Sequence, residues 1–300
     1  VVRDEFESKH GKIANGKMAI LGMGRLGSRD LTASSDLDLI FLYTHDEDAE
    51  ASDGEKQLYP QQYFIRLVQR LITAMSAPMA EGIIYELDFR LRPSGNAGPL
   101  ATHLGSFVKY QKEEAWVWES QSLVRARAVA GDESLITEIE GELNDLRLAN
   151  LDEKKVGNEI IEMRKTLDTE KPATNIFDVK RAVGGLIDIE FLVQWAVLTK
   201  KLKPNTSVEQ QTMSILANVE DSVIDIGEKE ALKSAYEFFN SVLQIQRVCL
   251  NEGFDPETGE KGFGELLCEQ AASPDFKTLQ ADLKSVQKEV RKIFLRTIKD

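Results

Sequence analysis

The stretch GMGRLGSRDLTASSDLDLIFLY, residues 22–43, contains two patterns that predict different folds. Its start, Gly22 to Gly27, matches the G-x-G-x-x-G turn of dinucleotide-binding proteins. Its second half, Asp36-Leu-Asp38 followed by an apolar run, sets two carboxylates at the start of a buried strand, a pattern that suits a metal ion. The residues between the two patterns decide which one shapes the fold.

The segment after the glycine turn is too short for a dinucleotide fold. That fold needs a helix between two parallel strands, and such a crossover takes about a dozen residues or more. Only Arg25 to Ser35 separate the turn from the next strand, and residues 32–35 form a polar, turn-like cluster. Asp46 lies where that fold places its ribose-binding acid, but the helix is missing. We therefore predict that residues 17–24 and 36–44 are antiparallel or offset neighbouring strands.

The carboxylates of residues 36–44 are expected on one face of the second strand. Side chains alternate along a strand, so Asp36 and Asp38 point to the same side, and the apolar run that follows indicates a strand buried on both faces. Unpaired buried charge is costly, and oxygen ligands side by side suit Mg²⁺. The alternative is a pair of aspartates that caps a strand at a turn.

A third strand is predicted over residues 82–93, GIIYELDFRLRP. Its polar side chains share one face: Glu86, Asp88, Arg90 and Arg92. A third carboxylate beside two arginines predicts a site for metal and phosphate together, with the backbone N–H groups of Gly27 and the hydroxyl of Ser28 holding phosphate oxygens. A surface ladder of salt bridges is the alternative for Asp88, Arg90 and Arg92.

Length and composition predict an ordinary two-domain protein. The chain has 300 residues, 42% hydrophobic and 29% charged, and a net charge of −13, which argues against a general nucleic-acid binder. No apolar run is long enough to cross a membrane, no signal peptide is evident, and Cys249 and Cys268 show no metal or redox spacing, so we expect a reduced, cytoplasmic protein without membrane contact. The start at Val1 leaves open either a piece of a longer protein or simple processing.

The fold class expected is α+β. Residues 1–130 are predicted to form a domain with a small mixed or antiparallel sheet. Helical periodicity dominates from about residue 103, and residues 131–300 are predicted to form an all-helical bundle domain.

Three longer blocks make the chain similar to a known family. They are GMGRLGSRDLTASSDLDLIFLY, YELDFRLRPSGNAGPLATHLGSFVKYQKEEAWVWESQSLVRARAVAGD and FDVKRAVGGLIDIEFLVQW, and with the strand before them they span residues 17 to about 200. They resemble the glutamate–ammonia-ligase (glutamine synthetase) adenylyltransferases, within the nucleotidyltransferase superfamily typified by DNA polymerase β. Departures from the family pattern are Arg25 in place of Lys, Ser28 in place of Gly, and a missing glycine near residues 182–183.

The resemblance implies transfer of AMP from ATP to a tyrosine hydroxyl of glutamine synthetase, with release of pyrophosphate. Family enzymes are bifunctional, and YQKEEAWVWESQSLVRARAVAGD resembles their C-terminal, adenylylating half. The resemblance implies that Asp36, Asp38 and Asp88 hold two Mg²⁺ ions and that Asp88 also takes the tyrosine proton. The PII signalling protein is an implied partner. Phosphorolytic removal of AMP, giving ADP, and a catalytically silent regulatory module remain as alternatives.

Other polar and aromatic residues carry weaker signals. Around Gly184-Gly185, four charged residues could close over the nucleotide or simply cap a helix and pair at the surface: Lys180, Arg181, Asp188 and Glu190. Arg125 and Arg127 face either a triphosphate or solvent. Trp116 and Trp118 are expected to pack rather than stack on adenine, and we expect the three histidines, His10, His45 and His103, at the surface.

Overall fold

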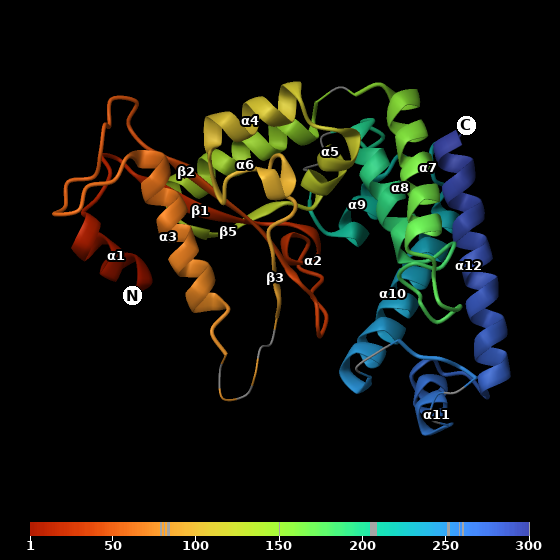
Figure 1. The fold of residues 1–300 in the computed structure, drawn as a ribbon. Coiled ribbons are helices and arrows are strands. Elements are labelled where there is room, and N and C mark those ends of the chain that lie inside the picture. The colour runs from red at the N-terminus through yellow and green to blue at the C-terminus, as the bar shows by residue number, and fades with distance from the viewer. Residues whose placement is uncertain are drawn as a thin grey trace. The chain divides into compact units, whose positions relative to one another are not determined.

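The computed structural model describes residues 1–78, 80, 82, 85–149, 151–204, 209–250, 253–257, 259 and 261–299. The chain divides into two compact units, Val1–Arg147 and Leu148–Asp300. Each unit is described by itself below, and Figure 1 labels the elements of both.

A mixed sheet organises the first unit. Its strands are β1 (Lys17–Gly22), β2 (Leu37–Thr44), β3 (Leu87–Asp88), β4 (Ala101–His103) and β5 (Arg127–Gly131). β1 pairs antiparallel with both β2 and β5, whereas β2 pairs parallel with β3 and β4. The antiparallel pairing of the first two strands confirms the prediction that the glycine turn does not begin a dinucleotide crossover.

Strand β2 is buried on both faces, as its unbroken apolar run predicts. Ile40 and Leu42 point into one hydrophobic cluster, and Leu39, Phe41 and Tyr43 point into another. Because β2 lies centrally between β1 and its two parallel partners, the two clusters sandwich it. The carboxylates at its start therefore sit on a rigid support.

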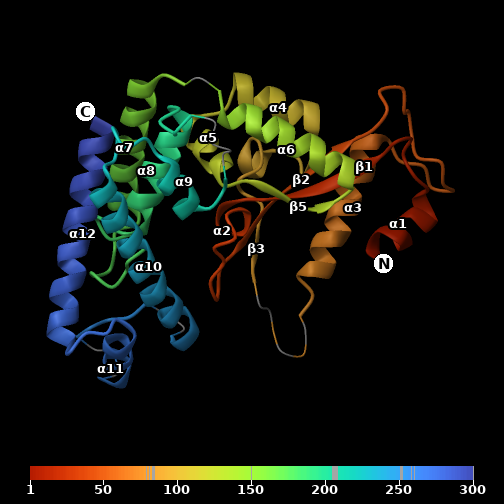
Figure 2. The same cartoon turned by 180° about the vertical axis from the view of Figure 1, so that it is seen from behind.

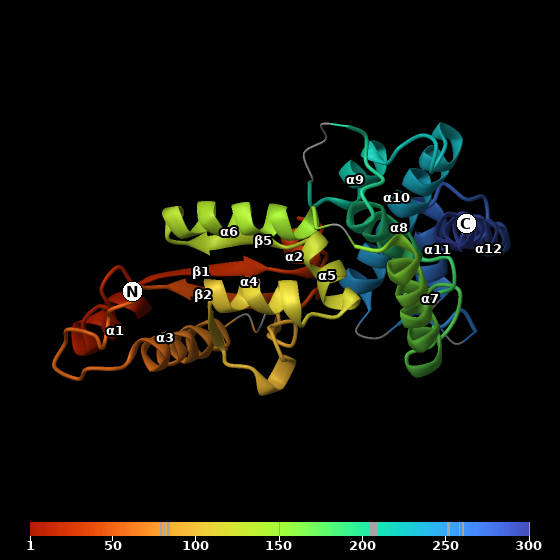
Figure 3. The same ribbon diagram turned by 90° about the horizontal axis from the view of Figure 1, so that it is seen from above.

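Helices cover the two faces of this sheet. The first cluster takes apolar residues from α4 (Leu104–Glu113), α5 (Val117–Val124) and α6 (Glu133–Arg147), and the second takes them from α1 (Val2–His10) and α3 (Pro60–Met75). α4 and α6 run together over one side of β1 and β2, and α3 lies on the other (Figures 1 and 2). α1 lies at one end of the sheet and the short helix α2 (Gly24–Gly27) at the other (Figure 3).

The third predicted strand is much shorter than expected. Among the described residues of this segment, β3 comprises Leu87 and Asp88, which pair with β2, while Met79, Glu81, Ile83 and Ile84 lie outside the described residues. After Asp88 the chain turns, because the Asp88 carboxylate accepts a hydrogen bond from the backbone N–H of Arg90 at 2.8 Å. The prediction that Asp88, Arg90 and Arg92 alternate along one strand face was therefore wrong beyond Asp88.

The boundary between the units lies after residue 147 rather than after residue 130. Helix α6 packs its apolar face, Leu135, Ile139, Leu143 and Leu146, into the sheet cluster of the first unit. At its end the buried Arg147 guanidinium donates to the carbonyl of Leu123 at 3.1 Å, and burial lowers the pKa of Arg147 to about 10. The apolar packing and the Arg147 hydrogen bond hold α6 to the rest of the first unit.

The described elements of the second unit are helices joined by loops. They are α7 (Glu153–Glu170), α8 (Leu186–Leu198), α9 (Thr212–Asn218), α10 (Ile226–Cys249), α11 (Lys261–Gln270) and α12 (Phe276–Lys299). α8 contacts α7, α9, α10 and α12, and nearly all of its side chains are buried. Among the described residues of the whole chain, no helix has both the length and the apolar composition that crossing a bilayer requires.

Candidate active site

The glycines of the G-x-G-x-x-G look-alike permit close packing around helix α2. Gly24 has a φ of +50°, and a Cβ there would lie 2.6 Å from Oδ2 of Asp38. A Cβ on Gly27 would lie 1.9 Å from the carbonyl oxygen of Arg125, next to β5. The pattern therefore brings a short turn against β5 and against the Asp38 carboxylate, which is a different use from cradling a dinucleotide.

The donors expected to bind phosphate are engaged within the chain. The N–H of Gly27 donates to the carbonyl of Met23 at 3.0 Å, and the Ser28 hydroxyl donates to the carbonyl of Gly24 at 3.2 Å. Ser28 is completely buried. Arg127 holds the same turn, since its Nε donates to the carbonyl of Gly27 at 3.2 Å. Helix α2 is therefore a short turn beside Asp38 that is held by hydrogen bonds within the chain.

Parallel pairing of β2 and β3 brings two of the three predicted carboxylates together. Asp38 and Asp88 are direct partners in the register, so their side chains leave the same face of adjacent strands, which lie about 4.8 Å apart. Asp36 precedes β2 and is exposed. Asp36 and Asp88 line one pocket of about 450 Å³, whose other lining residues are Glu86, Leu87, Phe89, Arg90, Arg92, Asn96 and Leu100.

Arg90 turns back onto Asp88. Its Nε lies 3.0 and 2.8 Å from the two carboxylate oxygens, and its Nη2 also contacts Oδ2. These hydrogen bonds hold the pKa of Asp88 below its ordinary value, although partial burial opposes them. Asp88 raises the pKa of Arg90, with smaller contributions from Asp36 and Asp38. One cation, whose side chain is 69% exposed, therefore lies in the field of all three aspartates.

Arg92 has a different place from the one the sequence predicts. It is buried, and its guanidinium donates to three carbonyls: that of Phe89 before it, at 2.7 Å, and those of Gly98 at 3.1 Å and Asn96 at 3.3 Å in the loop after it. Because each of its three guanidinium nitrogens donates to a backbone carbonyl, Arg92 stabilises the wall of the pocket. Asn96, which sequence reasoning missed, lines that wall; the turn-forming run Pro93 to Pro99 was the available signal.

The carboxylate oxygens are of the kind that Mg²⁺ prefers, but their arrangement only partly matches a metal site. Among the residues that the structure describes, no group of three or more His, Cys, Asp or Glu side chains is arranged to hold a metal ion. Asp38 and Asp88 provide adjacent hard oxygen donors, which Mg²⁺ prefers, and Asp36 lies at the rim of the same pocket as Asp88. A cation at Asp88 has to displace Arg90 from it.

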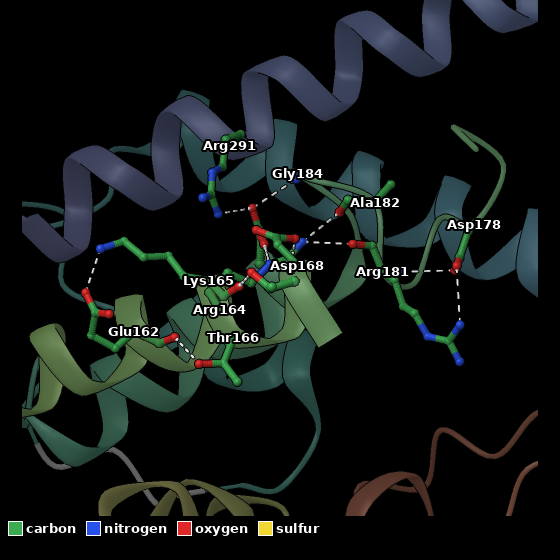
Figure 4. A network of polar contacts seen from close by, with 12 residues as sticks. Glu162, Arg164, Lys165, Thr166, Asp168, Asp178, Arg181, Ala182, Gly184 and Arg291 are labelled. Atoms are coloured by element: carbon green, nitrogen blue, oxygen red, sulfur yellow. Dashed lines mark hydrogen bonds and ion pairs between the residues drawn. The ribbon is translucent and has the colours of Figure 1, made fainter. Parts of the chain in front are cut away.

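Of the charged residues around Gly184-Gly185, Asp188 belongs to a buried network in the second unit, whereas Arg181 is exposed and pairs with Asp178. Asp188 is completely buried and binds Arg164, also buried, and Arg291 at 3.0 Å. It also accepts the N–H of Gly184 at 2.9 Å (Figure 4). Asp188 thus caps the loop before α8, as one of the two interpretations expects, but does so in the interior rather than at the surface.

Two minor expectations about aromatic residues were wrong. Trp116 is 68% exposed and Trp118 39% exposed, so neither is packed in the core. His10 is buried rather than exposed, while His45 and His103 are half-buried next to Tyr43. His10 is buried because α1 packs against α3, a contact that the sequence pattern did not reveal.

Comparisons with known proteins agree on one family. Residues 3–142 match the family model of glutamate-ammonia ligase adenylyltransferase. The chain is 46% identical over 293 residues to a bifunctional glutamine synthetase adenylyltransferase/adenylyl-removing enzyme from Mesorhizobium japonicum, and 45% identical to one from Brucella suis. Both alignments cover 98% of this chain, which spans about 30% of the length of each relative. On this similarity along nearly its whole length, the chain belongs to the glutamate–ammonia ligase adenylyltransferase family.

Proposed function

We propose that this chain transfers AMP from ATP to a tyrosine hydroxyl of glutamine synthetase and releases pyrophosphate. The observation that carries the proposal is the parallel register of β2 and β3, which sets Asp38 beside Asp88. Asp36 lines the same pocket as Asp88, and Arg90 stands among the three carboxylates. Carboxylates and a cation around an open pocket of about 450 Å³ suit a metal-bound triphosphate.

The relatives support the substrate and the reaction. They are named for adenylylation of glutamine synthetase and for removal of the adenylyl group. This chain spans about 30% of their length, and we propose that it carries one of the two activities. Adenylylation is favoured by the resemblance of residues 110–132 to the adenylylating half.

In the proposed mechanism, Asp36, Asp38 and Asp88 would hold Mg²⁺, two ions as in the family, and bound Mg²⁺ would stabilise phosphate charge as a Lewis acid. The tyrosine hydroxyl oxygen bonds to the α-phosphorus of ATP while the bond from that phosphorus to the pyrophosphate oxygen breaks. The hydroxyl proton passes to Asp88. Arg90 leaves Asp88 and binds the departing pyrophosphate, and the Gly27-Ser28 turn contributes triphosphate contacts after a local rearrangement.

Arg92 has an indirect part in this proposal. Its bonds to the carbonyls of Phe89, Asn96 and Gly98 keep the pocket wall in shape around Arg90. The same reasoning gives Arg127 the task of bracing helix α2, because its guanidinium holds the carbonyl end of that helix.

The finer features of the fold and setting follow from the same resemblance. We infer a polymerase β-like nucleotidyltransferase domain around the mixed sheet and a helical bundle in the second unit. A cytoplasmic location and control by the PII protein belong to the same proposal. The helices of the described second unit are consistent with the bundle.

The test uses the full chain with Mg²⁺, ATP labelled in its α-phosphate, and unmodified glutamine synthetase. Label transfer is expected for the wild type. It should fall at least about 10³-fold in the double variant Asp36→Asn with Asp38→Asn, because metal stabilisation is worth several kcal/mol. The matched control, Asp48→Asn with Glu50→Gln, alters two exposed acids of the 46–55 loop and should keep full activity. Wild-type transfer by the double variant would refute the site.

Removal of AMP is the second candidate, since the relatives are named bifunctional. It would use the same carboxylates with inorganic phosphate as the attacking group and would give ADP. Incubation with adenylylated glutamine synthetase and phosphate distinguishes the two. Release of ADP without any label transfer in the first assay would favour removal, and inactivity in both would favour a regulatory module.

A further inference from the structure

A second polar pocket lies between helices α1 and α3, and it shares no lining residue with the candidate active site. Its volume is about 500 Å³. The lining residues are Phe6, Lys9, His10, Lys56, Arg66, Gln69, Arg70 and Thr73. We call it the α1–α3 pocket. Both helices lie in the first unit, and α1 lies at the end of the sheet away from α2 (Figure 3).

Positive charge is concentrated in the α1–α3 pocket. Lys9, Lys56, Arg66 and Arg70 line it, whereas no aspartate or glutamate does. Among the described residues, no carboxylate lies within ion-pair distance of any of these four side chains. All four residues are exposed, so solvent screens part of their repulsion, and an anion bound among them relieves the rest.

The two helices build the pocket from one face each. Arg66, Gln69, Arg70 and Thr73 follow the i, i+3, i+4, i+7 spacing of a single face of α3, opposite its buried apolar residues. Phe6, Lys9 and His10 share one face of α1 in the same way. The pocket therefore lies along the edge of the apolar contact between α1 and α3, where polar side chains of both helices come together.

The floor and the rim of this pocket are fixed by contacts. The buried rings of Phe6 and His10 lie 4.6 Å apart, and the Arg70 guanidinium lies 5.7 Å from the Phe6 ring centre. His10 Nδ1 donates to the carbonyl of Lys56 at 2.7 Å, since a carbonyl only accepts. The backbone N–H of Lys56 donates to the carbonyl of Lys9 at 3.3 Å. Lys56 is thereby attached to the end of α1 although it comes from a loop.

Helix-end electrostatics explains only part of this cluster. Lys9 lies in the last turn of α1, where positive charge complements the helix dipole. Arg66 and Arg70 lie in the middle of α3, which spans Pro60–Met75, so neither end of that helix accounts for them.

We propose that the α1–α3 pocket binds a small polyanion, a molecule that carries at least two phosphate or carboxylate groups. Arg66 and Arg70, one helical turn apart, present guanidinium groups that match such oxyanions, and Lys9 and Lys56 face them across the pocket. Gln69 and Thr73 add neutral hydrogen-bond donors. The volume lies within the range of about 300–1,000 Å³ that is usual for small-molecule sites, so a metabolite fits better than a protein surface.

Calorimetric titration of the full chain tests the proposal. Inorganic pyrophosphate and citrate serve as probes in the presence of EDTA, and they distinguish a phosphate-bearing from a carboxylate-bearing ligand. At least one probe should bind to the wild type. Arg66→Gln with Arg70→Gln should weaken that binding at least about tenfold, because each charge-assisted hydrogen bond is worth about an order of magnitude in affinity.

Two controls locate the binding. Lys154→Gln with Lys155→Gln removes the same net charge from exposed positions of α7, and Arg90→Gln alters the candidate active site, where pyrophosphate also has a place. Both should leave the affinity of the α1–α3 pocket within about twofold. The proposal is overturned if neither probe binds, if Arg66→Gln with Arg70→Gln binds like the wild type, or if the α7 control weakens binding equally. Circular dichroism establishes that each variant is folded.

Discussion

The two units each contain an aspartate–arginine pair, and the pairs differ in their surroundings. In the first unit Asp88 meets Arg90 at the edge of a pocket, with the arginine side chain 69% exposed. In the second unit Asp188 meets Arg164, with side chains 0% and 1% exposed. The chemical groups are the same, yet water reaches only the first pair.

The pairs also differ in how completely their hydrogen bonds are satisfied. Arg164 spends its remaining donors on Asp168 and on the carbonyls of Arg181 and Ala182, and Asp188 accepts from Arg291 and the N–H of Gly184 (Figure 4). Arg90 bonds only to its neighbour two residues back, Asp88, among the described residues.

The comparison shows that burial and partner count separate a structural ion pair from one that can exchange partners. The buried Asp188–Arg164 pair, whose hydrogen bonds are satisfied, holds the loop before α8 to α7 and α12. Removing either member should greatly lower the stability of the second unit. In the Asp88–Arg90 pair the arginine is exposed and the carboxylate side chain is 12% exposed, so solvent screens the pair from one side and it contributes less to stability than a fully buried pair. It can therefore release its arginine to a triphosphate and its carboxylate to a cation at small cost.

The largest effect on stability is expected from Asp188→Ala. It leaves Arg164 charged in the interior without its buried partner, so the free energy of unfolding of the second unit should fall by about 3–5 kcal/mol. Urea denaturation monitored by tryptophan fluorescence measures this, since Trp195 lies in α8. Glu162→Ala removes an exposed ion pair with Lys165, also in α7, and should cost less than about 1 kcal/mol. Equal effects of the two variants would contradict the comparison.

Gly184→Ala should have the next largest effect. Gly184 has a φ of +80°, and a Cβ there would lie 1.8 Å from the carbonyl oxygen of Gln287 in α12. Backbone strain and the clash together should cost about 2–3 kcal/mol and loosen the loop that Asp188 caps. Gly262→Ala in α11, where a Cβ meets nothing within 4 Å, is the matched control in the same unit. Hydrogen exchange of the backbone amide of residue 184, compared between the wild type and the variant, reports whether the loop opens; unchanged protection would show that the network alone holds the loop.

In the first unit, sequence patterns predicted the regular strands better than the turn after Asp88. The apolar run after Asp38 predicted a strand buried on both faces, and the short link after Gly27 predicted an antiparallel pair. Strand alternation failed for Arg90 and Arg92, because it assumes a continuing strand and the chain turns after Asp88. The burial of Asp188 had a signal in the sequence: a helix that is apolar on all sides must be interior, so an aspartate in it needs a partner. The identity of that partner, Arg164, depends on tertiary packing.

Arg90→Gln tests the exchangeable pair. The midpoint of urea unfolding should fall only slightly, because Arg90 is largely exposed. The affinity for Mg²⁺ without nucleotide should rise severalfold, since the arginine no longer competes for the Asp88 oxygens. Calorimetry measures both the rise and its loss in Arg90→Gln with Asp88→Asn. A midpoint that falls as far as in Asp188→Ala would make Arg90 a structural residue like Arg164.

The smallest effect is expected in the titration of Asp88. Hydrogen bonds from Arg90 lower the pKa of Asp88 in the folded chain, so Asp88 contributes stability above its unfolded pKa of about 3.9 and loses it as the pH falls through the lower folded value. Arg90→Gln removes the main cause, and the pKa of Asp88 should move up toward its ordinary value. Carbon-detected NMR of the Asp88 carboxyl measures this, with the exposed Asp4 carboxyl as an unchanged reference. Added salt should reduce the difference between wild type and variant, because an exposed pair is screened. A pKa that stays low in Arg90→Gln would mean that a different donor holds Asp88, and the claim that Arg90 alone must leave to free this carboxylate would then fail.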